Sequence, residues 1–385
     1  MIGTQYFGFI WIDLKVALRI ALAQALCLTI LGLGQARAEG VRLDPLQIPA
    51  VISGPHGAVT FQLEGIVVRP DDGRPHPLAV LNHGSPRDGD DRPKMSPYAM
   101  WAQAVAFARR GWVAVAFMRR GYGHSQGEWA RPGGSCANRD YALAGLTEAA
   151  DIAAVAKSMS EQAYVSGGPW ISVGVSAGGF ATVALASQAP RDLAAAIVFA
   201  PGRGSSAPDM VCGEDRLVAA FAQYGKTSCL PLLWVSAAND HFFGPQLTAR
   251  FTGAFSHAGG HVDFVGVAPF GDDGHKLFGA RGLAIWSPIV DRFLAANNLA
   301  PRERLIELPA PVVATPSSLN AGGREAFKTY LESGPNKAFV VSGPHFGWAS
   351  GRRAVDEAVK EALAFCKPDP GAKCAVVNVN DKPAD

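Results

Sequence analysis

The sequence predicts an α/β fold, a doubly wound and mostly parallel sheet followed by a small C-terminal α+β unit. Three observations lead to it. From about residue 58, short apolar runs of strand type alternate with longer segments of helical spacing. These strand-like runs are continuously apolar, which is typical of strands covered by helices on both faces. Near residue 298 this pattern stops, and a shorter alternation begins after a Pro-rich stretch.

The strands and helices of the large unit follow in order. We expect an antiparallel opening pair at 59–63 and 65–68, because both runs are short and rich in β-branched residues. Right-handed crossovers between the later, parallel strands would give the doubly wound arrangement. The later strands are expected at 78–82, 112–117, 170–173, 194–199, 231–236 and 262–267, and the main helices at 97–109, 141–158, 180–186 and 282–296.

The N-terminus resembles a secretory signal peptide over residues 1–38. Lys15 and Arg19 precede an apolar core at 20–33, and Ala36-Arg37-Ala38 is a small-residue cleavage site. A membrane anchor is the alternative, but the apolar core is short for a bilayer span. We therefore expect an exported protein, periplasmic or secreted.

Behind the signal peptide, the sequence predicts a main domain at 39–300 and a small domain of unknown role at 301–385. The small domain is expected to contain helices at 323–331 and 352–365 and strands at 338–341 and 375–379. It has no motif that translates into chemistry.

The charge balance argues against a polyanionic partner. The chain of 385 residues has a formal net charge of +2, and loss of residues 1–38 would leave it near neutral, so nucleic acid is not expected as a partner. No later apolar run is long enough for a membrane span. The charged run 87–92 is interpreted as a solvated loop rather than a calcium site. We expect no cofactor and no metal, and the sequence leaves the oligomeric state open.

Five cysteines remain after the predicted cleavage site. In an oxidising compartment, two disulfides and one free thiol are the simplest arrangement. Cys366 and Cys374 enclose a short loop and form the first expected pair. Cys136–Cys212 is the second, with Cys212–Cys229 as its alternative.

The run Gly174-Val175-Ser176-Ala177-Gly178-Gly179 lies between an apolar strand and a helix. In that context a G-x-S-x-G pattern indicates a nucleophile elbow, a tight turn that exposes a serine hydroxyl above the sheet. Ser176 would be the nucleophile. The amides behind it begin a helix and so favour a developing oxyanion. The alternative is an ordinary strand-to-helix turn.

A serine nucleophile needs a base and an acid that orients the base. Asp240 follows one predicted strand and His275 follows the last, so both would meet Ser176 at the carboxyl edge of the sheet. Asp240 could instead be a turn or capping residue, and His275 a solvated one. Asp272 and Asp273 are rivals of Asp240 that better suit a loop-shaping role, and His345 is the main rival of His275.

The oxyanion hole is expected to pair the amide of Ala177 with that of Ser85, in the loop after strand 78–82. Tyr122, Trp129 and Phe242 are candidate substrate-binding residues, with core packing as the alternative. The segment 201–227 occupies the usual place of a lid and is short, so we expect a small cap and a fairly open site.

Together these motifs resemble the α/β-hydrolase superfamily. The motifs are His83-Gly84, the run 120–127, the elbow, Asn239-Asp240 and Gly274-His275, and they are most similar to the dienelactone-hydrolase-like and prolyl-oligopeptidase-like branch. The resemblance implies Ser176, Asp240 and His275 as the triad and Ser85 and Ala177 as oxyanion donors. Dienelactone hydrolases proper use a cysteine, so Ser176 shifts the expectation from lactone opening to ester hydrolysis.

The sequence thus predicts an exported serine hydrolase that cleaves a small or medium carboxylic ester through an acyl-enzyme on Ser176. A serine peptidase of the oligopeptidase type is the first alternative, although no β-propeller precedes the domain. A non-catalytic envelope binding protein on a hydrolase scaffold is the second.

Overall fold

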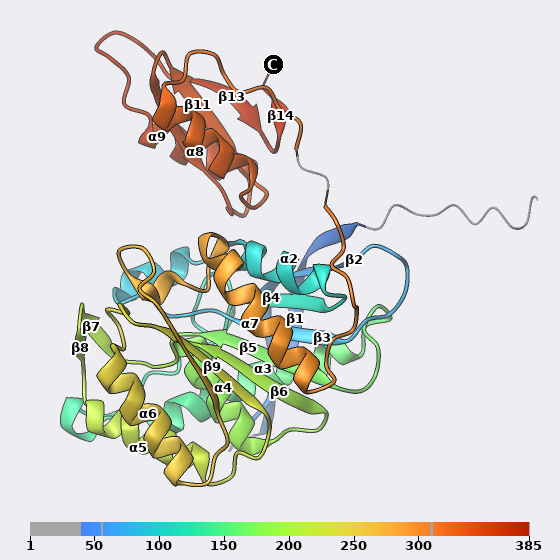
Figure 1. The fold of residues 1–385 in the computed structure, drawn as a ribbon, viewed down its shortest axis with the longest axis vertical. Helices are drawn as coiled ribbons and strands as arrows, with labels where there is room; N and C mark the ends of the chain where they lie inside the picture. Colours follow the sequence, from blue (N-terminus) through green and yellow to red (C-terminus); the bar gives the residue numbers. More distant parts are fainter. Residues whose placement is uncertain (1–39, 55–56, 309–310, 385) are drawn as a thin grey trace, which may run out of the picture. The chain divides into compact units, whose positions relative to one another are not determined.

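The structure, a computed structural model, describes residues 40–54, 57–308 and 311–384. The predicted signal peptide at 1–38 lies outside them. The main feature is an eight-stranded sheet of order β1-β2-β4-β3-β5-β6-β9-β10 (Figure 1). Its strands are β1 (Val41–Gly54), β2 (Gly57–Pro70), β3 (Leu78–Asn82), β4 (Val113–Phe117), β5 (Trp170–Val175), β6 (Leu193–Phe199), β9 (Leu232–Ala237) and β10 (Asp263–Val267).

The opening pair differs from the prediction. Strands β1 and β2 form a long antiparallel pair, and both predicted strands, 59–63 and 65–68, lie within β2. The partner strand was missed because Pro45 and Pro49 interrupt its pattern. Proline is tolerated there because β1 is the edge strand of the sheet.

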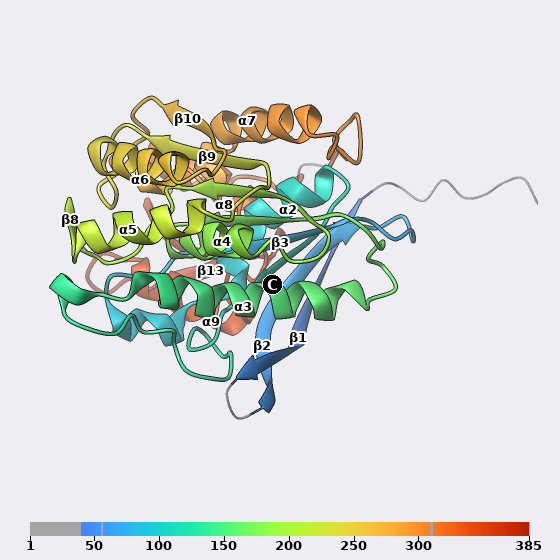
Figure 2. The same cartoon turned by 90° about the horizontal axis from the view of Figure 1, so that it is seen from below.

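Six consecutive strands, from β4 to β10 in the sheet order, pair in parallel, as predicted. Their side chains alternate between two apolar cores. On β3, Val80 packs into one core, and Ala79 and Leu81 pack into the other. The first core is covered by α3 (Tyr141–Ser160), α4 (Ala177–Gln188), α5 (Glu214–Gly225) and α6 (Pro245–His257), and the second by α2 (Trp101–Arg109) and α7 (Leu283–Ala296) (Figure 2).

The shorter elements lie in the connections. A small hairpin, β7 (Ser205–Ala207) and β8 (Met210–Val211), follows β6. Single 3₁₀ turns are formed by Gly89–Lys94, Pro97–Met100, Cys136–Asn138, Gly274–Lys276 and Ala280–Gly282. Among the described residues, no helix is long and apolar enough to cross a membrane.

The C-terminal unit is α+β, as predicted. Its antiparallel sheet has the order β12-β11-β13-β14 and carries two helices. The elements are α8 (Ala321–Leu331), β11 (Ala338–Ser342), β12 (His345–Ala349), α9 (Val355–Phe365), β13 (Ala375–Val379) and β14 (Lys382–Pro383). The sequence missed β12 because Gly347 interrupts it. A Cβ there would lie 2.2 Å from the carbonyl of Ala362, so glycine lets α9 pack closely on the strand. The boundary at residue 300 stays a prediction.

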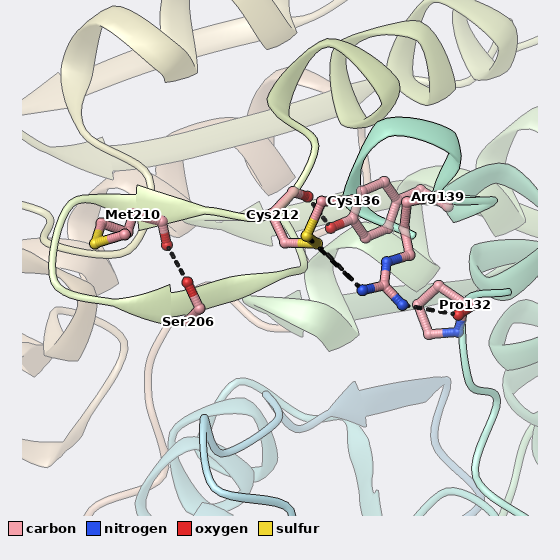
Figure 3. The surroundings of a disulfide bond; sticks show 7 residues. Pro132, Cys136, Arg139, Ser206, Met210 and Cys212 are labelled. Carbon is pink, nitrogen blue, oxygen red and sulfur yellow. Dashed lines mark hydrogen bonds between the residues drawn. A yellow bond between two sulfur atoms is a disulfide. The ribbon is translucent and has the colours of Figure 1, made fainter. Parts of the chain in front are cut away.

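Both predicted disulfides are present. Cys366 pairs with Cys374, and Cys136 pairs with Cys212. Cys229, the alternative partner of Cys212, is an exposed free cysteine. The Cys136–Cys212 bond joins the long loop before α3 to the end of the β7–β8 hairpin (Figure 3).

Candidate active site

Ser176 lies in the predicted strand-to-helix turn, between β5 and α4. Its backbone has φ of +54° and ψ of −122°, a region that costs a non-glycine residue on the order of 1–3 kcal/mol. The turn is possible because its neighbours lack side chains. A Cβ on Gly174 would lie 2.3 Å from the carbonyl of Gly178, and one on Gly178 would lie 2.3 Å from the carbonyl of Asn82. This is the geometry of a nucleophile elbow.

The loop after β3 is held beneath the elbow by buried polar contacts. The side-chain nitrogen Nδ2 of Asn82, the last residue of β3, donates to Ser172 Oγ on β5 (3.0 Å) and to Thr182 Oγ1 on α4 (3.1 Å). The next residue, His83, is buried, and burial together with the nearby Arg119 guanidinium holds its pKa well below the usual range. The neutral ring accepts a hydrogen bond from the Arg119 amide at 3.1 Å. These contacts tie two strands and a helix together under Ser176.

His275 and Asp240 meet as predicted. His275 Nδ1 lies 3.0 Å from Asp240 Oδ2, and the Asp240 side chain is fully buried. Asp240 Oδ1 also accepts hydrogen bonds from the amides of Phe242 and Phe243, at 2.7 and 2.9 Å. Asp240 is therefore both a turn cap and the partner of His275. The Phe242 ring stacks on the imidazole with centroids 3.8 Å apart, which fixes the plane of the ring.

Asp273 and His345, the alternatives to Asp240 and His275, have other roles in the structure. Asp273 accepts hydrogen bonds from the amides of His275 (3.0 Å) and His241 (3.2 Å) and so shapes the loop, as expected. Burial alone would raise the pKa of Asp273, but these two amides outweigh it and the pKa is lowered. His345 lies on β12, where Nε2 is 3.2 Å from Asp369, and so has a different carboxylate partner.

Ser85 and Ala177 both line the cavity that contains Ser176. Among the described residues, neither of their amides donates a hydrogen bond to a protein acceptor. Ala177 begins α4, so its amide has no acceptor within the helix. Between the two, a Cβ on Gly84 would lie 3.1 Å from Ser176 Cβ, so glycine brings this loop close to the nucleophile. The geometry fits the predicted oxyanion hole.

Of the three candidate substrate-binding residues, two line the cavity beside Ser176 and one does not. Trp129 and Phe242 line a cavity of about 260 Å³ together with Ser176. Tyr122 does not, which corrects the prediction. Its ring is fully buried, and its hydroxyl lies 3.0 Å from the hydroxyl of Ser85. Tyr122 therefore positions the oxyanion loop from below.

We call His83–Ser85, the elbow, Asp240 and His275 the catalytic floor. The outer wall is formed by residues 129–141 and 202–212, which the Cys136–Cys212 disulfide joins. The wall includes the β7–β8 hairpin, and the Tyr141 hydroxyl donates to the carbonyl of Cys212. Of the segment 201–227, only residues 202–212 line the cavity, whereas α5 packs into the first core; the predicted cap is therefore limited to the hairpin segment.

The sequence analysis missed four arginines that line the cavity, namely Arg87, Arg92, Arg139 and Arg203. Two of them belong to the run 87–92, which was interpreted only as a solvated loop. Arg203 carried a signal that could have been used. It follows β6 at the carboxyl edge of the sheet, where Ser176 and Asp240 were sought.

Part of the chain matches a known protein family. Residues 60–243, just under half of the chain, match the sequence model of the family described as X-Pro dipeptidyl-peptidase (S15 family). No curated protein matches the chain.

Several solved structures are similar to the chain. The esterase Pf2001 of Pyrococcus furiosus is 14% identical over 66% of this chain and 90% of its own, with a TM-score of 0.47. The acylaminoacyl peptidase of Pyrococcus horikoshii is 17% identical over 73% of this chain and 44% of its own, with a TM-score of 0.48. Est1E of Butyrivibrio proteoclasticus, solved with ferulic acid bound, is 16% identical over 62% of this chain and 96% of its own, with a TM-score of 0.44.

The chain has the α/β-hydrolase fold. Its parallel sheet, its serine elbow and the chain order of serine, aspartate and histidine define that fold. The elbow serine and the histidine–aspartate pair are the parts from which a serine hydrolase builds its site.

Proposed function

We propose that the protein is an exported serine hydrolase that cleaves a small or medium carboxylic ester through an acyl-enzyme on Ser176. The observation that carries the proposal is the contact of 3.0 Å between His275 Nδ1 and the buried Asp240. A carboxylate on Nδ1 selects the tautomer whose Nε2 is free to accept the serine proton.

The reaction then follows from the floor residues. Ser176 Oγ attacks the ester carbonyl, and its proton passes to His275 Nε2. The Ser85 and Ala177 amides bind the negative charge that develops on the carbonyl oxygen. The intermediate collapses, the alcohol leaves with the proton from His275, and water hydrolyses the acyl-enzyme through the same histidine.

A peptidase is the second candidate, because residues 60–243 match a family described as X-Pro dipeptidyl-peptidase. Release of an N-terminal dipeptide requires a site that tolerates the ammonium group of the peptide. The cavity beside Ser176 is lined by four arginines and by no aspartate or glutamate. Such a cavity repels a cation, which favours an ester over a free peptide N-terminus.

The test is reaction of the mature protein with a fluorophosphonate probe, beside Ser176→Ala. Labelling that is lost in the variant supports an activated serine, whereas an unlabelled but folded wild type would contradict the proposal. Rates with 4-nitrophenyl butyrate and Ala-Pro-4-nitroanilide then separate the two candidates. Faster release of 4-nitroaniline than of 4-nitrophenol would favour the peptidase.

The proposed export can be tested separately, by measuring whether the signal peptide is removed. Cleavage after Ala38 would give a mature chain that begins at Glu39. The intact mass of the protein recovered from the periplasm or medium of an expressing bacterium should match that start. Recovery only of a chain that retains residues 1–38 would contradict the proposed processing.

A further inference from the structure

The cavity beside Ser176 has an unusual charge. Four arginines, Arg87, Arg92, Arg139 and Arg203, line a space of about 260 Å³, and no acidic side chain lines it. A concave site with charges of one sign concentrates ligands of the opposite sign. Whether these guanidinium groups are available depends on what each already contacts.

Arg139 is half-buried in the outer wall, and the described contacts of its guanidinium are uncharged. One of its terminal nitrogens donates to the carbonyl of Pro132 at 3.2 Å, and the other lies 3.2 Å from Cys212 Sγ (Figure 3). These contacts orient the guanidinium without neutralising it.

Arg87 and Arg92 are oriented by aromatic rings. The Arg87 guanidinium lies 3.5 Å from the centre of the Phe242 ring, and that of Arg92 lies 4.0 Å from the centre of the Trp129 ring. Stacking of this kind holds an arginine in place and leaves its edge free for hydrogen bonds. Neither arginine forms an ion pair among the described residues.

The nearest acidic residues in sequence are engaged elsewhere. Asp91 binds Lys94 at 2.7 Å, and Asp88 accepts a hydrogen bond from the amide of Asp90. Arg87 donates to Ser205 Oγ and to the carbonyl of His241, which are both neutral acceptors.

Arg203 is the buried member of the four, with only 5% of its surface exposed. It contacts Glu148 at 2.8 Å, but Glu148 also lies 3.5 Å from the fully buried Arg119. One carboxylate therefore faces two cations, and this group keeps a net positive charge. Burial raises the pKa of the neighbouring Tyr141, while Arg139 and Arg203 act in the opposite direction.

We propose that the site selects esters that carry a second, ionised acid group, a carboxylate on the acyl or the alcohol part. Arg139, Arg92 and Arg203 bind this carboxylate while Ser176 attacks the ester carbonyl. Guanidinium groups match the geometry of a carboxylate and bind it through charge-assisted hydrogen bonds. The inference rests on the proposed ester hydrolysis and adds its substrate class.

The experiment uses two matched pairs of esters with the full mature chain. Mono-4-nitrophenyl adipate is compared with 4-nitrophenyl hexanoate, and 4-acetoxybenzoate with 4-acetoxybenzamide. The measured quantity is the ratio of kcat/KM, anionic over neutral, in the wild type, Arg139→Gln and Arg92→Gln. Intrinsic ester reactivity cancels when ratios are compared between proteins.

Arg74→Gln is the matched control. It removes one positive charge from the loop before β3, at the opposite end of that strand from His83, and Arg74 does not line the cavity. We expect the ratio in at least one pair to fall about tenfold in Arg139→Gln or Arg92→Gln, and to be unchanged in Arg74→Gln. Added salt should lower the wild-type ratio.

The outcomes separate the two proposals. Hydrolysis of the neutral esters with the same ratio in all four proteins would overturn the charge selection and leave ester hydrolysis standing. If a fluorophosphonate labels Ser176 but none of the four esters reacts, the proposed substrate class is wrong. If Ser176 is not labelled either, both proposals fail together.

Discussion

The catalytic floor and the outer wall of this site are built in different ways. The floor lies where β3, β5 and β9 end and in the turn after β10, and it is held by close backbone approach and buried polar contacts. The wall consists of long connections with only a two-strand hairpin, and it is held by one disulfide and by the stacking of Arg92 on Trp129. In the two proposals above, the floor carries out the reaction, and the wall contributes to the choice of substrate.

The largest expected effect is a loss of kcat from a substitution in the catalytic floor that leaves the outer wall unchanged. Asp240→Asn keeps the shape of the side chain but no longer holds His275 in the tautomer that serves Ser176. We expect kcat to fall about 10⁴-fold, as when the aspartate of a serine protease triad is amidated. The measurement is steady-state ester hydrolysis, with circular dichroism to establish folding.

His345→Gln is the control for this prediction, because His345 faces Asp369 in the C-terminal unit. It should leave kcat unchanged. A loss of activity in His345→Gln with full activity in Asp240→Asn would reverse the assignment of the base.

The second prediction breaks the wall and spares the floor. Replacing Cys136 and Cys212 by serine removes a disulfide that closes a covalent loop between residues 76 apart in sequence. We expect the free energy of unfolding to fall by about 4 kcal/mol, because the unfolded chain gains conformational freedom. Ser176 should still react with a fluorophosphonate below the lowered melting temperature, because the floor does not depend on this bond. The preference for anionic esters should fall, because Arg139 contacts Cys212.

The matched control is the double serine variant of Cys366 and Cys374. This disulfide joins cysteines only 8 residues apart in sequence, and both are distant in sequence from every floor residue. It should lose less stability and keep the wild-type ester preference. Equal changes in preference in both variants would show that the wall has no special role.

The third prediction tests how tightly the floor is packed. A Cβ on Gly178 would lie 2.3 Å from the carbonyl of Asn82 and 2.4 Å from that of His83. Gly178→Ala should therefore lower the free energy of unfolding by about 3 kcal/mol and displace the Ala177 amide. Urea unfolding and kcat measure the two effects. Gly133→Ala in the wall, where a Cβ meets nothing within 4 Å, should be near neutral.

The same contrast explains how much the sequence could predict. The elbow at Ser176 and the contact of Asp240 with His275 could be predicted because each residue follows a strand, and parallel strands bring their carboxyl ends to one edge. For Tyr122 the sequence left binding and core packing open, and it could not decide between them because the buried position depends on a hydroxyl contact with Ser85 across the loop. The positive charge of the cavity could not be predicted either, because its arginines come from three separate connections that only the tertiary structure brings together.

The smallest expected effect concerns the loop that carries His275, in which Gly271 and Asp272 are exposed. Because two amides hold the pKa of Asp273 below its ordinary value of 3.8, the ionised carboxylate stabilises the folded state at neutral pH. This contribution is present above the ordinary pKa and is lost as the pH falls through the lowered one. Asp273→Asn should therefore lower the melting temperature by a few degrees at neutral pH, with a difference that shrinks below about pH 4. Asp272→Asn is the matched control, since its exposed carboxylate caps nothing among the described residues. A melting-temperature difference for Asp273→Asn that grows as the pH falls below about 4 would contradict this account, because it would require the protonated carboxyl to be the stabilising form.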